Sequence, residues 1–527
     1  MSYTSFLFML VFFLLTYVIY LLTNYKYRWI VLTISSFLFY FISSNGHILP
    51  LLAATAIIWV VGLLIQKTDD SSKSIPKDTD RQEKKRIKAK IKRKTGAVLS
   101  IGVVSCVLFI LILKYGNFIR SIFVANAEPL PLLQPLGISF YTLQAISYLV
   151  DVKRKRVTAC RNPLKLLLYL SFFLTVVEGP IVRFNEIENQ FFAQEKKQIT
   201  QKNFYYGAML VLWGLFMKII VSNRAALIAE NVFNHYSDVG GITVVLGVLF
   251  YTVQLYFDFA GIMNVLRGLA CLMGISLPEN FKRPFFAKSI NEFWQRWHIT
   301  LGSWLRDYVF YSVSLSKPFQ KISKLSRKKF NAYYSVIIPT SVALFFVWIT
   351  NGLWHGSGTK YILYGMYYYV LMMLGIFMEP LFKKICEKVK LDRKSKLYSL
   401  FQVVRTFVIV NIGMLIFRAD SISAAAAMVK SVFSIDKTMD FLHHPMATLY
   451  GNYNPGTYHD IVIILFGVAA AFLVGILREK NVNILEKIYK LNPVLRSALY
   501  FVFLILIVLI GAYGEDYQIN QMIYAGF

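Results

Sequence analysis

Long apolar blocks separated by short polar or basic stretches run through almost the whole chain. A helix needs roughly 20 apolar residues to cross a bilayer, so the longer blocks predict transmembrane helices. The short and polar block 137–152 is our candidate for a re-entrant segment. We expect eleven to thirteen full spans among fourteen blocks, which are residues 5–22, 29–44, 48–65, 97–113, 137–152, 164–182, 204–221, 241–257, 261–277, 334–352, 361–378, 401–417, 461–476 and 499–512. The pattern predicts an all-α, polytopic integral membrane protein with a single membrane domain over residues 1–527.

The composition favours the same class of protein. Of the 527 residues, 56% are hydrophobic and 16% are charged, whereas soluble domains carry roughly 25% charged residues. The net charge of +29 would suggest nucleic acid binding in a soluble protein. Here the Lys and Arg residues lie between apolar blocks, where membrane topology and anionic lipids explain them, so we expect membrane lipids and no nucleic acid as partners. Residues 5–22 lack a charged leader and an evident cleavage site, so we interpret them as a retained span.

The distribution of basic residues predicts the topology. Residues 67–94 contain twelve Lys or Arg against five Asp or Glu, which predicts a cytoplasmic loop. Its second half, residues 81–94, is typical of a solvated basic helix or arm. Three predicted spans precede this loop, so the amino terminus is expected outside. Counting onward places four further basic stretches inside, which are residues 153–161, 282–329, 383–396 and 478–496.

Several kinds of chemistry lack their usual motifs. The four cysteines are far apart and none forms a CxxC pair, so we expect no disulfide or structural zinc. No phosphate-binding loop, dinucleotide-binding turn, nucleophile elbow or metal-ligand spacing is apparent. Gln144, Glu178 and Asp258 lie within apolar blocks. They either line a wet passage or form hydrogen bonds between helices, and the sequence leaves both open.

Residues 291–307 predict an aromatic helix that carries a histidine. In a helix, Trp294, Trp297 and Trp304 share one face, because they are three and seven residues apart and seven residues make about two helical turns. Trp side chains with basic neighbours are typical of a helix at the membrane interface. His298 is then either a functional group or a packed polar residue, and the pattern alone does not decide between them.

His355 has the stronger functional setting. It lies between two apolar blocks and is flanked by Gly352, Gly356 and Gly358. An ionisable group at membrane depth is costly and usually marks a reaction path or an ion pathway. Glycines permit close approach by a ligand, and neutral imidazole suits general-base catalysis. We therefore favour a functional role over that of a structural histidine bound to a carbonyl.

Six separated motifs resemble those of one family, the membrane-bound O-acyltransferases. The two most specific are residues 293–307 (Phe-Trp-Gln-Arg-Trp-His-Ile-Thr-Leu-Gly-Ser-Trp-Leu-Arg-Asp) and residues 352–356 (Gly-Leu-Trp-His-Gly). The supporting motifs are residues 137–144, 178–181, 257–261 and 280–285. The resemblance covers residues 100–420, the expected catalytic core. The chain is most similar to the bacterial branch with the alginate O-acetyltransferase membrane subunit and the teichoic acid D-alanyl transferase. Residues 417–419 and 521–527 resemble the alginate type, although the Ala-Gly-Phe ending departs from its aromatic-rich form.

The resemblance implies roles for particular residues. It implies that His355 is the catalytic histidine, that His298 is the second family histidine, and that a central funnel meets near His355. The predicted topology places His298 on the cytoplasmic side and His355 across from it, so we expect donor binding and acceptor chemistry to be separate. Lys282, Arg283 and Arg296 are candidates for attracting donor phosphates. The predicted substrate-binding residues are Trp294, Trp297, Arg296, Trp304, Asp307, Trp354 and Asn351.

The resemblance also implies the reaction. We expect an enzyme of the bacterial plasma membrane that moves an acyl group, most simply acetyl, to hydroxyls of a cell-surface or exported polysaccharide. The donor is a cytoplasmic thioester, either acetyl-coenzyme A or an acyl carrier protein, with no permanently bound cofactor and no metal. A partner extracytoplasmic transferase is expected. One alternative is D-alanyl transfer from a carrier protein to teichoic acid. Others are a transporter or polymer flippase, which the absence of internal repeats disfavours, and a structural scaffold.

Overall fold

The computed structural model describes residues 1–124, 128, 130, 135–192, 199–451, 457–513 and 517. Within these residues the chain consists of helices joined by turns and extended segments, and it contains no strand. It divides into two compact units, Met1–Phe204 with Leu269–Pro278 and Tyr205–Gly268 with Glu279–Phe527. The all-α fold predicted from the apolar blocks is confirmed.

The first unit is built around a buried helix, α6, which packs against α3, α4 and α7. Thirteen residues of α6 are buried, including polar ones, so the polar block 137–152 forms an internal helix of this unit. The helices of the unit are α1 (Leu14–Leu22, preceded by the π-helical Leu7–Phe13), α2 (Arg28–Ser43), α3 (Leu49–Asp70), α4 (Arg81–Leu113), α5 (Gly116–Phe123), α6 (Ile138–Lys153), α7 (Pro163–Ser171) and α8 (Phe184–Phe191), with a short 3₁₀ turn at Tyr25–Tyr27.

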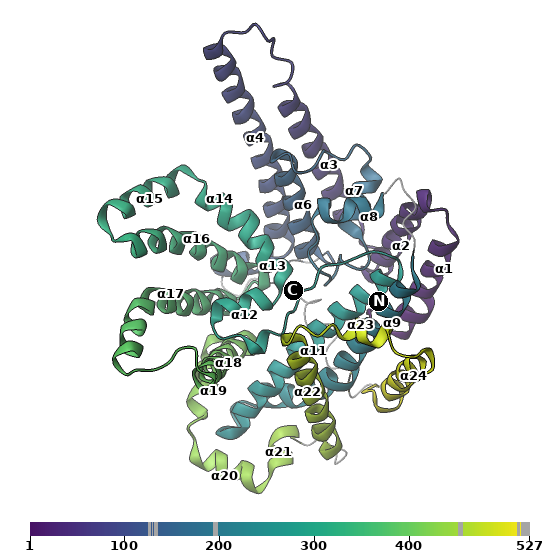
Figure 1. Cartoon of the computed structure of the whole chain (residues 1–527), viewed down its shortest axis with the longest axis vertical. Coiled ribbons are helices and arrows are strands. Elements are labelled where there is room, and N and C mark those ends of the chain that lie inside the picture. Colours follow the sequence, from purple (N-terminus) through teal and green to yellow (C-terminus); the bar gives the residue numbers. More distant parts are fainter. Residues whose placement is uncertain are drawn as a thin grey trace. The chain divides into compact units, whose positions relative to one another are not determined.

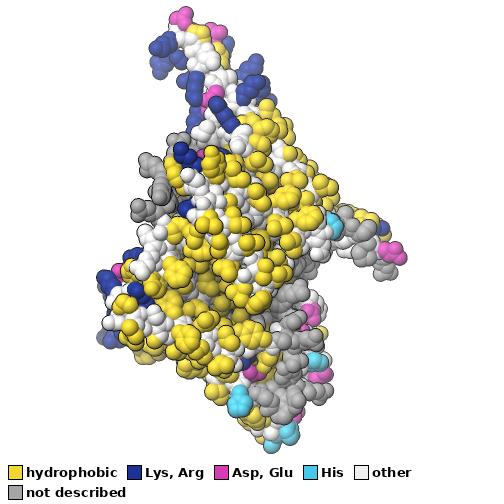
Figure 2. Space-filling view, turned by 90° about the vertical axis from the view of Figure 1, so that its right-hand side faces the viewer, with side chains coloured by type: hydrophobic (Ala, Val, Ile, Leu, Met, Phe, Trp, Pro, Cys, Tyr) yellow, Lys and Arg dark blue, Asp and Glu magenta, His cyan; other side chains and the backbone are white. Residues whose placement is uncertain are grey.

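The predicted basic loop is the tip of a helical hairpin formed by α3 and α4 (Figure 1). Asp80 caps α4 by accepting hydrogen bonds from the backbone N–H groups of Gln82 and Glu83, so the basic stretch 81–94 starts a helix, one of the two forms that the sequence left open. Lys and Arg side chains gather at this tip, and hydrophobic side chains cover the lower part of the hairpin (Figure 2). The hairpin therefore combines a polar end with an apolar stem.

The block 164–182 does not form the full span that we expected. Helix α7 ends at Ser171, and residues 172–183 continue as buried chain without regular helix. Pro180 cannot donate a backbone hydrogen bond, and a Cβ on Gly179 would lie 2.3 Å from the Leu174 carbonyl oxygen. Apolar composition predicted burial correctly here, but this turn excludes a continuous helix.

The second unit contains the longer helices, several of which lie in antiparallel pairs. Its helices are α9 (Gln201–Leu215), α10 (Asn223–Asn234), α11 (Ile242–Leu272), α12 (Ile290–Arg296), α13 (Ile299–Trp304), α14 (Tyr311–Ser314), α15 (Lys317–Lys329), α16 (Ala332–His355), α17 (Thr359–Lys388), α18 (Lys396–Arg418), α19 (Ile422–Ser431), α20 (Ile435–His443), α21 (Pro445–Tyr450), α22 (Thr457–Glu479), α23 (Ile484–Tyr489) and α24 (Pro493–Ile510). π-Helical segments Phe216–Ser222 and Leu305–Phe310 and a 3₁₀ turn at Pro284–Phe286 complete it. Helices α16 and α17 pack side by side (Figure 1).

Nine helices of the described chain are long and apolar enough to cross a membrane: α3, α4, α9 continued through α10, α11, α16, α17, α18, α22 and α24. Large apolar side chains on them are exposed, such as Leu509 at 77% and Ile101 at 64%, as expected for contact with lipid. The number is below the expected eleven to thirteen. Blocks 241–257 and 261–277 join into α11, and several amino-terminal blocks form helices of 16 residues or fewer. The protein is a multi-pass membrane protein.

Asp258 forms a structural ion pair inside the second unit. Its carboxylate lies 2.5 Å from Lys218 Nζ, and both side chains are almost fully buried. A buried charge is tolerated when an opposite charge compensates it. Asp258 thus serves as an interhelical contact between α11 and the π-helical segment after α9, one of the two roles that the sequence left open.

Candidate active site

His298 lies at a break between two short helices. Helix α12 ends at Arg296 and α13 begins at Ile299, so the single aromatic helix predicted over residues 291–307 does not form. His298 itself has a φ of 45°, in the left-handed region that non-glycine residues seldom adopt. Such backbone strain is often found at functional sites. The break rotates the residues before and after His298 onto different faces.

The His298 ring is buried, with an exposed fraction of 2%. It packs edge-on to Phe259 at 4.9 Å between ring centroids, and its Nδ1 lies 3.3 Å from Asn280 Oδ1. Asn280 Oδ1 also accepts hydrogen bonds from the backbone and hydroxyl of Thr300. His298 is outside the nine candidate spans, and burial lowers its pKa to about 3. The ring is therefore neutral at physiological pH, with Nδ1–H donating to Asn280 and Nε2 as its basic nitrogen.

His355 is the last residue of α16 and is also buried, at 3% exposure. Its ring packs against Phe417 of α18 at 5.2 Å and against Tyr364 of α17 at 5.8 Å. The neighbouring glycines serve this packing, because a Cβ on Gly352 would lie 2.5 Å from the Tyr361 carbonyl oxygen and one on Gly356 2.1 Å from the Tyr361 ring. Gly352 and Gly356 therefore allow close approach of α17, whereas the sequence suggested that they allow close approach of a ligand.

Trp354 contacts both histidines. Its ring lies 5.6 Å from the His298 ring and 4.9 Å from the His355 ring, measured between centroids. The two histidines are 57 positions apart in the sequence. Our expectation that the two histidines are widely separated is therefore wrong. The segment around His298 packs closely against α16, where the Trp294 ring lies 5.0 Å from Trp348.

A pocket of about 640 Å³ adjoins this group of residues. Its walls include Trp294, His298 and Asn351. Trp294 Nε1 and Asn351 Oδ1 are buried, and neither has a hydrogen-bond partner within the described residues. A buried polar atom without a partner costs about 1–3 kcal/mol, so a donor and an acceptor beside an open pocket favour a polar ligand. His355 does not line the pocket and connects to it through Trp354, which touches His298.

Five of the seven predicted substrate-binding residues do not line this pocket, and one of them is Trp354, which contacts both histidines. Trp297 packs among other aromatic rings, 5.0 Å from Phe281, and Trp304 packs 5.3 Å from Tyr308. Both are buried in the unit, which corrects the expected membrane-interface face. Arg296 forms ion pairs with Glu292 and Glu479 at 2.6 and 2.5 Å, so its contacts are structural. Asp307 binds Arg306, which does line the pocket.

The sequence reasoning missed Arg306 and one face of α16. Arg306 lies within the most specific motif, and its Nε lies 2.9 Å from Asp307 Oδ1. The lining residues of α16 recur at helical spacing, which is the signal that marks a shared face. They are Thr340, Leu344, Val347, Trp348 and Asn351. Periodicity within 334–352 would have found them once Asn351 was chosen as an anchor.

Comparison with known proteins finds one matching family and several related enzymes. Residues 161–327 match the profile of MBOAT, the membrane-bound O-acyltransferase family. The chain is 31% identical over 344 residues to a probable alginate O-acetylase AlgI of Pseudomonas syringae pv. tomato, covering 64% of this chain and 60% of that protein. It is 29% identical to a teichoic acid D-alanyltransferase of Bacillus subtilis, covering 62% and 79% of the two chains. It is 27% identical to a peptidoglycan O-acetyltransferase of Helicobacter pylori, covering 64% and 65%.

The matched region spans about three fifths of the length of the alginate O-acetylases from three Pseudomonas species. The profile match contains His298, and the adjoining α16 supplies Trp354 and His355. The profile, the relatives and the apolar helices agree with the motifs in the sequence. The chain carries a domain, residues 161–327, of the membrane-bound O-acyltransferase family.

Proposed function

We propose that this protein is an O-acyltransferase of the bacterial plasma membrane that moves an acyl group, most simply acetyl, from a cytoplasmic thioester to hydroxyls of a cell-surface or exported polysaccharide. One observation carries the proposal: Trp354 contacts two histidines from separate motifs, beside a pocket with two polar atoms that lack a hydrogen-bond partner in the part of the chain that the structure describes. The family match over residues 161–327 supports the class of reaction, and the alginate O-acetylase relatives support a polysaccharide acceptor.

In this proposal, His355 is the catalytic base. Its neutral imidazole takes the proton from an acceptor hydroxyl, whose oxygen attacks the thioester carbonyl carbon. The resulting tetrahedral intermediate collapses to the ester, and the thiolate leaves with the proton that the imidazolium returns. A side-chain movement of Trp354 is required to bring His355 into the pocket. Trp294 Nε1 is a suitable donor for the carbonyl oxygen as negative charge develops on it, and Asn351 Oδ1 a suitable acceptor for a substrate hydroxyl.

His298 is a second group of the same site. It lines the pocket, and its neutral ring presents Nε2 as a basic nitrogen while Nδ1 is held by Asn280. Since Trp354 touches both imidazoles, the separate donor and acceptor roles that the predicted topology suggested give way to one catalytic unit. His298 then positions the thioester or shares proton transfer with His355.

The test compares His355→Ala and His298→Ala in purified full-length protein with acetyl-coenzyme A or an acetylated carrier protein. Loss of a general base lowers the rate about 10²–10⁴-fold, so we expect a fall of this size in kcat for His355→Ala with little change in donor KM. We expect a smaller fall for His298→Ala. The control is His459→Ala, since His459 is exposed on α22. Near-normal ester formation by folded His355→Ala would contradict the proposal.

D-Alanyl transfer is the second candidate. The Bacillus subtilis teichoic acid D-alanyltransferase is matched over 79% of its length, a larger share than the alginate O-acetylases. The chemistry at the thioester is the same, but the donor is an aminoacyl carrier protein. Mild alkaline release of the ester-linked acid from the cell envelope separates the two candidates, because acetate and D-alanine are distinguishable by mass spectrometry.

A further inference from the structure

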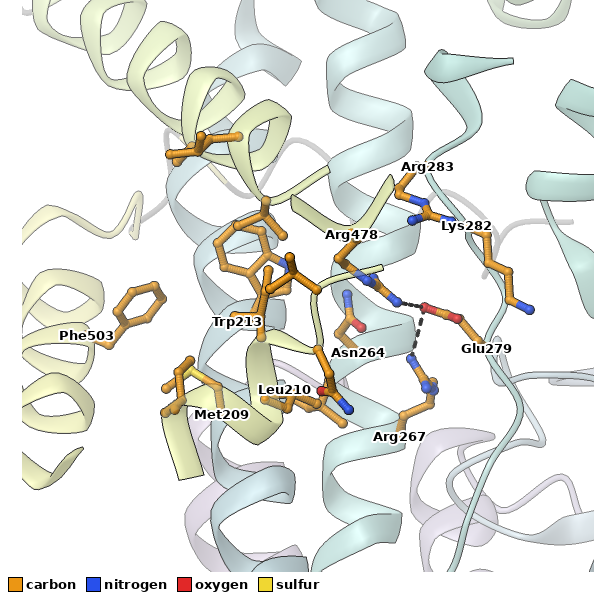
Figure 3. A pocket seen from close by; sticks show the side chains of 18 of the residues that line it. Met209, Leu210, Trp213, Asn264, Arg267, Glu279, Lys282, Arg283, Arg478 and Phe503 are labelled. Atoms are coloured by element: carbon orange, nitrogen blue, oxygen red, sulfur yellow. Dashed lines mark hydrogen bonds and ion pairs between the residues drawn. The ribbon is translucent and has the colours of Figure 1, made fainter. Parts of the chain in front are cut away.

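A second large pocket lies in the second unit, lined by residues other than those of the candidate active site. Its volume is about 710 Å³, and its walls come from α9, α11, α22 and α24 with the segments that follow α11 and α22. Figure 3 shows charged side chains, among them Arg267, Lys282 and Arg478, on one side of it and apolar side chains on the other. The pocket thus has two walls of opposite character.

The polar wall carries an excess of positive charge. Four cations, Arg267, Lys282, Arg283 and Arg478, line it together with a single carboxylate, Glu279. The Glu279 carboxylate oxygen lies 2.5 Å from a guanidinium nitrogen of Arg478 and 3.9 Å from one of Arg267. Two guanidinium groups therefore already share this carboxylate. Arg283 lies 3.0 Å from Glu479, a carboxylate that Arg296 shares, and Lys282 makes no salt bridge within the described residues. Positive charge therefore exceeds negative charge on this wall. The wall is therefore suited to an anion that can accept several hydrogen bonds, which is the chemistry of a phosphate.

The apolar wall is formed by helices that are candidate membrane spans. Met209 and Trp213 of α9, Leu473 of α22 and Phe503 of α24 line it. The rings of Trp213 and Phe503 lie 6.4 Å apart. Only 11% of the apolar stretch of α24 is buried in the protein, so most of this helix is available for contact with lipid. An acyl chain gains free energy by burying its apolar surface against such a wall, whereas a free phosphate has no apolar surface to bury.

We propose that this pocket binds one anionic phospholipid. The headgroup phosphate binds the four cations, and an acyl chain lies against Trp213, Leu473 and Phe503. Basic pockets between transmembrane helices are a recognised way of selecting anionic headgroups. The proposed lipid is a resident of the bilayer and not a reactant of the acyl transfer, so this inference is independent of the proposed function.

The lipid site and His298 share one segment of the chain. Glu279, which lines the polar wall, is followed directly by Asn280, whose side chain holds His298 Nδ1 at 3.3 Å. A bound headgroup adds contacts to this segment through Lys282 and Arg283. Lipid occupancy is therefore expected to make the segment under His298 more resistant to unfolding.

The test is lipid binding to the purified full-length protein, followed by native mass spectrometry. The probes are phosphatidylglycerol, phosphatidylcholine of the same acyl chains, and water-soluble glycerol 3-phosphate. We expect preferential retention of phosphatidylglycerol. Lys282→Gln is the main variant because Lys282 makes no salt bridge within the described residues, so its loss leaves no carboxylate unpaired. A Lys near an anionic headgroup changes affinity on the order of fivefold, and we expect a loss of that size.

Two further variants make the result decisive. Phe503→Ala should weaken the binding of both phosphatidylglycerol and phosphatidylcholine, because the substitution removes part of the apolar wall. Lys383→Gln is the matched control, since Lys383 is 67% exposed on α17 and does not line the pocket. Equal retention of the two lipids, or equal losses in Lys282→Gln and Lys383→Gln, would overturn the proposal. Displacement of phosphatidylglycerol by glycerol 3-phosphate at equal concentration would overturn it in favour of a site for soluble phosphates.

Discussion

At the scale of single residues, the protonation state of His298 links burial to stability. Its folded pKa of about 3 lies below the ordinary value of 6.5, so the unfolded chain binds a proton at mildly acidic pH that the folded chain does not. The stabilising contribution is complete above pH 6.5 and falls by about 1.4 kcal/mol per pH unit below it. His298→Gln retains a donor for Asn280 but does not titrate. We expect wild-type Tm to drop more than that of the variant between pH 7 and pH 5. Equal falls in Tm for the two proteins would show that folding does not lower the pKa of His298.

Asn351 is expected to show a trade between stability and activity. Its buried Oδ1 has no partner within the described residues, which costs about 1–3 kcal/mol in the absence of a ligand. Asn351→Leu has a similar shape and removes this cost, so Tm should stay level or rise. Acyl transfer should nevertheless fall at least about tenfold, because the acceptor for the substrate is lost. Unchanged activity in a stable Asn351→Leu protein would remove Asn351 from the site.

The same scale shows where sequence reasoning on the site succeeded and failed. Trp294, His298 and Asn351, which the sequence suggested as site residues, line the pocket, and Trp354 contacts both histidines. Their catalytic and binding roles stay predictions. Trp297 and Trp304 were placed on one helical face with Trp294 because periodicity assumes a continuous helix. The left-handed conformation of His298 interrupts that helix. A single φ angle is set by tertiary contacts such as the bond to Asn280, which no local pattern of side chains reports.

At the scale of elements, the close packing of α16 on α17 positions His355. A Cβ on Gly352 would lie 2.5 Å from the Tyr361 carbonyl oxygen, so Gly352→Ala must push the helices apart and lower stability by about 1–3 kcal/mol. Gly375→Ala on α17 is the control, because nothing lies within 4 Å of its Cβ position. The control should gain up to about 1 kcal/mol from helix propensity. Opposite shifts of Tm in the two variants confirm the contact, whereas equal shifts contradict it.

Element boundaries were predictable where apolar length and charge agreed. The basic stretch at residues 81–94 began a helix, one of the two forms that the sequence left open, and the apolar blocks of α16, α17 and α18 were found from hydrophobicity alone. The block 164–182 failed because burial and helix formation are different properties. Its Gly179-Pro180 turn keeps the chain buried without helical hydrogen bonds. Hydrophobicity reports the first property and says little about the second.

At the scale of the whole molecule, the direction of acyl transfer depends on which side of the membrane holds residues 67–94. This prediction rests on twelve basic against five acidic residues. Ser72 lies in the turn between α3 and α4, so Ser72→Cys should react with a membrane-impermeant thiol reagent only after lysis. The unmodified protein gives the background, since Cys106 and Cys386 are buried and the other two cysteines are partly buried. Labelling in intact cells would reverse the topology and the proposed transfer.

The α3–α4 hairpin is also the place where we expect the chain to tolerate being cut. Its tip is a short turn with exposed Lys73 and Lys77, and each helix packs separately on α6. A protease specific for basic residues will therefore cleave there first, while the folded stem holds both fragments in place. Two polypeptides that end and begin within residues 71–80 should assemble when they are produced together. The hairpin thus provides a natural split point for attaching reporters to an otherwise membrane-embedded protein.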